Sequence, residues 1–159
     1  MEPIGKKEAI ELLNLDGSNV YRLLGRAHEV RMAKRAHTVN LCGIINAKSG
    51  MCSEDCKFCA QSAHNSAKVE CYKLVDATKM LTEAKVSHSN RASRFGIVTS
   101  GLRVDKRDEV EEIAKAIKKI GEEGGILPCA SLGNISKDTL LRLNQAGLTR
   151  YHCNLKTAK

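Results

Sequence analysis

The chain has 159 residues, a formal charge of +8 at pH 7, 42% hydrophobic residues and a mean hydropathy of −0.30. This length predicts one globular domain with a modest core, and no run of residues approaches the ~18 apolar residues of a membrane span. The charge does not indicate a nucleic-acid partner, because aromatic residues make up only 3% and the basic residues are scattered through helical stretches. The N-terminal residues are charged from Glu2 onward, so we expect a cytoplasmic protein with reduced cysteines.

Helices and strands are predicted in alternation along most of the chain. Apolar residues at helical spacing predict two N-terminal helices, over residues 6–13 and 17–36, and we assign residues 1–37 to a helical extension. The aliphatic segment 39–46 predicts the first strand, whose C-terminal end leads into a stretch that is rich in cysteine.

The remaining chain continues this alternation. Strands are predicted over 95–99, 126–131 and 149–154, and helices over 78–86, 105–120 and 136–146. The second of these helices is strongly periodic and directs four apolar residues inward, namely Val110, Ile113, Ala114 and Ile117. Ser136 is the predicted N-cap of the last helix, and Gly147 follows its end. This order of elements predicts an α/β fold with a parallel sheet.

Three cysteines follow the first predicted strand at C-x3-C-x2-C spacing: Cys52, Cys56 and Cys59. This spacing places three thiolates on one short loop. An iron-sulfur cube has four irons, so three Cys ligands leave one iron open to a small molecule. A structural zinc site closes with four ligands, and no second pair of ligands is near in the sequence. We therefore favour an iron-sulfur site over zinc, a disulfide or chance clustering.

At these residues the sequence resembles the radical S-adenosylmethionine (SAM) superfamily, whose signature carries an aromatic residue, here Phe58, just before the last cysteine. The segments 46–50 and 60–64, on either side of the motif, more closely resemble the biotin synthase family. Later segments agree with that resemblance, namely 93–101, 128–133 and 151–155. The resemblance runs along nearly the whole chain.

The resemblance implies sulfur insertion into dethiobiotin to form biotin, with chemistry carried by the cofactors. The open iron of a 4Fe-4S cluster chelates SAM, an electron cleaves SAM reductively, and the 5′-deoxyadenosyl radical abstracts hydrogen from dethiobiotin. A second iron-sulfur cluster then donates the sulfur, and a reducing protein supplies the electron. The resemblance implies that Phe58, Gly133 and Asn154 bind the cofactors, with Gly133 and Asn154 lining the SAM and substrate pocket.

The same resemblance implies a second cluster with Cys129 as a ligand. Familiar family members carry another ligand where this chain has Gly96, so the second cluster is expected to differ or to be absent. Cys71 and Cys153 are two further thiols, which either serve that cluster or are small half-buried residues without a ligand role.

The family builds a (β/α)8 barrel, which needs about 250 residues or more. We therefore expect residues 38–159 to form a partial TIM-type (β/α) barrel, about the first four strands, resembling the N-terminal half of a biotin synthase truncated at its C-terminus. An open half-barrel exposes a strand edge and inward-facing apolar side chains, which predicts poor solubility as a monomer or dimerisation through that edge.

One departure from the family concerns SAM. The family's Asn-Leu-Asp/Glu-Thr corresponds here to residues 154–157, in which Lys156 replaces the acidic residue. The acidic residue is expected to accept hydrogen bonds from the SAM ribose hydroxyls, whereas a lysine can only donate. The sequence therefore leaves three hypotheses: a biotin synthase-like enzyme, another radical SAM reaction on a small molecule, and an inactive iron-sulfur binding remnant.

Overall fold

The structure is a computed structural model that describes residues 3–154. It divides the chain into two compact units, Met1–Val39 and Asn40–Lys159. The first unit consists of the two predicted helices, α1 (Lys6–Leu13) and α2 (Gly17–Arg35), and neither helix has a buried residue. The predicted domain boundary at residue 37 stays a prediction. In the part of the chain that is described, no helix has the length and apolar character needed to span a bilayer.

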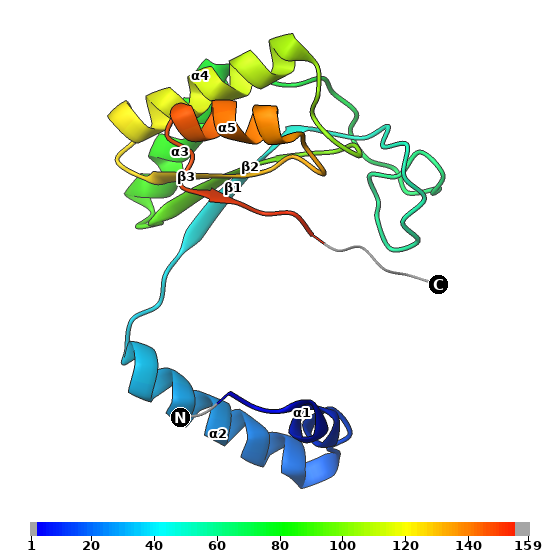
Figure 1. The fold of residues 1–159 in the computed structure, drawn as a ribbon, viewed down its shortest axis with the longest axis vertical. Coiled ribbons are helices and arrows are strands. Elements are labelled where there is room, and N and C mark those ends of the chain that lie inside the picture. Colours follow the sequence, from blue (N-terminus) through cyan, green and yellow to red (C-terminus); the bar gives the residue numbers. More distant parts are fainter. Residues whose placement is uncertain (1–2, 155–159) are drawn as a thin grey trace. The chain divides into compact units, whose positions relative to one another are not determined.

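The second unit is built around a parallel sheet of four strands in the order of the sequence. The strands are β1 (Cys42–Lys48), β2 (Arg94–Thr99), β3 (Leu127–Ser131) and β4 (Arg150–Tyr151). The helices between them are α3 (Ala77–Ser89), α4 (Arg107–Glu123) and α5 (Lys137–Gln145), and they lie on one side of the sheet (Figure 1). Sequential parallel strands with a helix after each of the first three are the arrangement of a partial (β/α) barrel, which confirms the predicted fold class.

The core lies between the sheet and these helices. Phe95 and Ile97 on β2 and Ile120 on α4 are fully shielded from solvent. The four α4 positions that were predicted to point inward are also buried: Val110, Ile113, Ala114 and Ile117. Fully burying a Val, Ile or Phe side chain contributes roughly 1.5–3 kcal/mol, so this layer stabilises the unit.

The opposite face of the sheet keeps apolar side chains in contact with solvent. Side chains alternate between faces along a strand, so Ile44 lies on the opposite face from the buried Ile45. Ile44 is 72% exposed and Leu127 of β3 is 46% exposed. The predicted exposure of inward-facing apolar residues is therefore confirmed.

Two predicted strands differ from the observed ones by more than one residue. β1 begins at Cys42 rather than at residue 39, because its register with β2 starts at the pair of Cys42 and Arg94, next to the bond of 2.9 Å from Ser93 N to Leu41 O. β4 has two residues rather than six, since its registered pairing with β3 is limited to Cys129 with Arg150 and the next pair. The β-rich sequence of both segments favoured longer strands than the available partner backbone supports.

Candidate functional site

A cavity of about 440 Å³ lies at the carboxyl ends of the strands. Its walls come from β1, β2, β3 and the segment after β4, together with the excursion that follows β1. We call that excursion, residues 50–71, the cysteine loop; it extends beyond one end of the sheet (Figure 1). Five of the predicted site residues line this cavity: Cys52, Cys56, Cys59, Gly133 and Asn154. Barrel enzymes place their chemistry at this end of the strands.

Cys52 is held by the returning limb of the cysteine loop. Its N–H donates to the backbone carbonyl of Gln61 at 3.0 Å, and its carbonyl accepts from Ala63 N at 2.9 Å. The side-chain oxygen of Gln61 also accepts from Gly50 N at 2.5 Å. Cys52 is buried, whereas Cys56 and Cys59 are partly exposed. The loop therefore fixes one thiol firmly below its surface.

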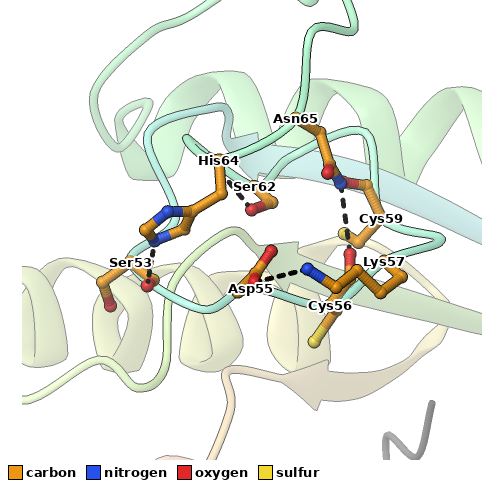
Figure 2. Close-up of polar contacts among 8 residues, drawn as sticks. All are labelled: Ser53, Asp55, Cys56, Lys57, Cys59, Ser62, His64 and Asn65. Carbon is orange, nitrogen blue, oxygen red and sulfur yellow. Dashed lines mark hydrogen bonds and ion pairs between the residues drawn. The ribbon is translucent and has the colours of Figure 1, made fainter. Parts of the chain in front are cut away.

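Cys56 and Cys59 are tied to each other and to Asn65. Cys59 N donates to Cys56 O at 3.0 Å. The side-chain amide of Asn65 donates to Cys56 O at 3.2 Å and to Cys59 O at 2.8 Å (Figure 2). One carboxamide thus binds the backbone of two of the three candidate ligands.

The outer rim of the cysteine loop carries charge. Lys57 Nζ lies 2.7 Å from Asp55 Oδ2, and this hydrogen bond holds the pKa of the Asp55 carboxyl below its usual value (Figure 2). His64 Nε2 lies 3.1 Å from the carbonyl of Ser53 (Figure 2). One of these contacts joins two side chains and the other joins a side chain to backbone, and neither involves a thiol.

Gly133 occupies a position that only glycine fits. Its φ is 79°, and an added Cβ would collide with the carbonyl oxygen of Leu102. The Tyr151 hydroxyl donates to the Gly133 carbonyl and accepts from Leu132 N, which is 3.3 Å away. Burial raises the pKa of Tyr151, so the phenol stays protonated and keeps this donor. The turn at Gly133 therefore shapes the cavity wall through its backbone.

Phe58 and Cys129 lie outside the lining of this cavity. Phe58 is 60% exposed and lines a separate pocket of about 380 Å³ on the loop. Cys129 is buried on β3, in register with Gly96 of β2, and Arg94 Nη1 lies 3.7 Å from its sulfur. Gly96 therefore stands beside Cys129 in the sheet, and without a side chain it offers no ligand there.

The remaining cysteines are placed differently from one another. All seven cysteines are free, and Cys71 and Cys153 are exposed rather than half-buried. Cys153 lines the cavity with the three motif thiols, whereas Cys71 packs against Gly50 on the other side of the loop. Lys156, which departs from the family pattern, lies outside the described residues.

The residues present fit an iron-sulfur cluster in their donor chemistry. Three free cysteines line one cavity, and thiolates are the ligands that these clusters select. Thr99, on the same cavity wall, has a buried hydroxyl oxygen without a hydrogen-bond partner in the part of the chain that is described. Within residues 3–154, no group of three or more His, Cys, Asp or Glu side chains is arranged to hold a metal ion. The thiols therefore share a cavity without converging on one point.

The sequence profile of the Radical SAM superfamily matches residues 48–159. A biotin synthase of Trichlorobacter lovleyi is 44% identical over 156 residues, which cover 98% of this chain and 47% of that protein. A biotin synthase of Anaeromyxobacter sp. (strain Fw109-5) is 46% identical over 159 residues, which cover 99% of this chain and 43% of that protein. The chain spans about half the length of the curated relatives it matches.

Two solved structures share the fold. Methylornithine synthase (PylB) has a TM-score of 0.77 at 19% identity, covering 94% of this chain and 43% of that chain. HydG, a maturase of the FeFe-hydrogenase, has a TM-score of 0.72 at 17% identity, covering 93% of this chain and 33% of that chain. The profile match covers more than half of the residues and includes all three motif cysteines. The chain belongs to the Radical SAM superfamily, whose cofactors are a 4Fe-4S cluster and S-adenosylmethionine.

Proposed function

We propose that this chain contributes the SAM-cleaving site of a biotin synthase-like enzyme, which inserts sulfur into dethiobiotin to form biotin. The observation that carries the proposal is the cavity at the strand ends. Three free cysteines line it together with residues of β1, β2 and β3 and of the segment that follows β4. The similarity to biotin synthases along nearly the whole chain supports the same reaction.

Cys52, Cys56 and Cys59 would hold the 4Fe-4S cluster, whose chemistry when SAM is bound is reductive cleavage of the cofactor to a carbon-centred radical. Gly133 and Asn154, on the facing wall, would contact SAM or substrate. Since Gly133 presents backbone rather than a side chain, its contribution is shape and close approach. Phe58 would cover the cluster from the outer side of the loop.

The partners follow from the same proposal. The substrate is a small molecule, and an external reducing protein supplies the electron. We place the reaction in the cytoplasm, in keeping with seven free thiols. The short strand β4 leaves a sheet edge through which a second copy can pair, giving a homodimer.

One observation favours a second candidate, a different radical SAM reaction on a small molecule. Sulfur insertion calls on a second cluster with Cys129 among its ligands. On β2, the residue in register with Cys129 is Gly96. The Arg94 guanidinium donates a hydrogen bond to the Cys129 sulfur. A chain without that second cluster would keep SAM cleavage and lose sulfur donation.

The test is anaerobic cluster reconstitution of the full chain, followed by electron paramagnetic resonance of the reduced protein with and without SAM. Formation of 5′-deoxyadenosine and of biotin from dethiobiotin is measured in the same samples. A signal that shifts with SAM, with both products, supports the leading proposal. 5′-Deoxyadenosine without biotin supports the second candidate, and a cluster that does not respond to SAM indicates an inactive remnant.

A further inference from the structure

Asn65 and Gln61 hold the cysteine loop from opposite sides of the motif. The Asn65 side chain donates two hydrogen bonds, of 3.2 and 2.8 Å, to the carbonyls of Cys56 and Cys59 (Figure 2). A single amide group that reaches both carbonyls sets the separation of those two residues. Fixing the backbone in this way restricts where the two sulfur atoms can lie.

Gln61 acts on the third cysteine through two different groups. Its backbone carbonyl accepts from Cys52 N at 3.0 Å. Its side-chain oxygen accepts from Gly50 N at 2.5 Å and from Ser49 Oγ at 3.2 Å. Gln61 therefore binds the backbone both at Cys52 and at Gly50, in the turn immediately before that cysteine.

That turn needs such support because its backbone is unusual. Gly50 and Met51 both have positive φ, at 75° and 51°. For a methionine, this conformation costs roughly 1–2 kcal/mol. Ser100 Oγ donates to Gly50 O at 2.8 Å. Gly50 is therefore bound by Gln61 at its N–H and by Ser100 at its carbonyl. The turn directs the chain so that Cys52 enters the loop below the surface.

We infer that Gln61 and Asn65 are positioning residues, whose side-chain amides fix the loop backbone at the three motif cysteines and so favour their joint binding of a 4Fe-4S cluster. The inference rests on the proposed role of Cys52, Cys56 and Cys59 as cluster ligands. Neither amide nitrogen nor amide oxygen is itself offered as a ligand. Removing a group that orients metal ligands typically lowers metal affinity by about 10- to 100-fold.

The two residues use opposite halves of the carboxamide, which allows matched substitutions. Asn65→Asp keeps the shape but removes both donors, and it places a carboxylate against two carbonyls. Gln61→Met keeps the length and removes the acceptor, whereas Gln61→Glu keeps an acceptor in the same place. Asn144→Asp, at an exposed position on α5, makes the same chemical change away from the loop.

The experiment measures the rate at which an iron chelator bleaches the reconstituted full-length chain, together with the line shape of the reduced cluster's paramagnetic resonance spectrum. We expect Asn65→Asp and Gln61→Met to lose iron about tenfold faster than wild type and to give broadened spectra. Gln61→Glu and Asn144→Asp should keep the wild-type rate. Circular dichroism of each apoprotein checks folding, and Asn65→Ala replaces Asn65→Asp if the latter does not fold.

The outcomes separate the two proposals. Wild-type chain that takes up no iron would overturn the cluster assignment and this inference with it. The wild-type chain could instead take up iron while the Asn65 and Gln61 variants show its bleaching rate and its paramagnetic resonance spectrum. That result would overturn the inference alone. Equal bleaching rates for Gln61→Glu and Gln61→Met would show that the side-chain acceptor at position 61 does not affect iron retention. Gln61 would then not be a positioning residue.

Discussion

The helix-covered face of the sheet and the cysteine loop are held together by different interactions. Between the sheet and its helices, Ile97 of β2 and Ile117 of α4 are fully shielded from solvent and belong to the same apolar core. In the loop, residues 50–71, the buried positions are Gly50, Cys52 and Ser62, and order comes from hydrogen bonds to backbone groups. Apolar burial scales with area and gives stability, whereas hydrogen bonds are directional and give placement. The comparison implies that folding and cofactor binding can be disturbed separately.

The largest expected effect is confined to the loop. Cys56→Ala should abolish the visible absorption of the reconstituted cluster, because two thiolates cannot hold the cube. The thermal midpoint of the apoprotein should stay unchanged, since Cys56 lies outside the core. The matched control is Cys71→Ala, an exposed cysteine outside the motif, which should keep the spectrum. An unchanged spectrum for Cys56→Ala would defeat the ligand assignment.

The converse change affects the packed layer. Ile117→Ala removes a fully buried side chain of α4 and should lower the free energy of unfolding by about 2–5 kcal/mol, measured by urea denaturation. Molecules that remain folded should bind iron in the wild-type ratio. If iron per folded chain fell in step with stability, the two regions would not be independent.

Gly133→Ala should disturb both regions at once. A Cβ at φ 79° strains the backbone and meets the Leu102 carbonyl, so we expect a loss of roughly 2–3 kcal/mol in unfolding free energy. The same displacement moves the cavity wall opposite the cysteines and should weaken the spectral response to SAM. Gly121→Ala is the matched control, because the added Cβ meets open space on α4. A normal response to SAM in Gly133→Ala would mean that this wall does not touch the cofactor.

The smallest expected effect depends on pH and concerns the outer surface of the helices. Arg142 donates two hydrogen bonds to Glu111, at 2.9 and 2.6 Å, and they hold the pKa of the Glu111 carboxyl below its usual value. The stabilisation is present above the unfolded-state pKa of about 4.3 and is lost as the pH falls through the lower folded-state pKa. Glu111→Gln should therefore show a slightly shallower fall of the thermal midpoint in acid. Curves that stay parallel from neutral to acidic pH would contradict this.

The sequence predicted the packed layer well, because burial leaves a periodic pattern. The inward positions of α4 and the cap at Ser136, whose side chain accepts from Thr139 N, were both confirmed. Strand ends were predicted less well. Val39 is 68% exposed and outside β1, since strand length depends on partner backbone that a local pattern does not contain.

The candidate site was predicted in part. The spacing of the motif identified the three thiols that now line one cavity, although their ligand role stays a prediction. Gln61 lay inside a segment that resembles biotin synthases, yet neither it nor Asn65 had a predicted role. An amide in a polar loop has no period and no characteristic spacing, so only the folded geometry reveals which carbonyls or N–H groups it meets.

The cysteine loop leaves and rejoins the body of the protein at a single point. Ser49 and Tyr72 exchange two backbone hydrogen bonds of 3.1 Å each, and the Tyr72 hydroxyl donates to Asn46 O at 2.7 Å. A loop closed at its base in this way costs only about 0.6 kcal/mol for each doubling of its length. We therefore expect insertions between these two residues to leave the sheet intact, so that the loop can change in length while the scaffold that carries it stays the same.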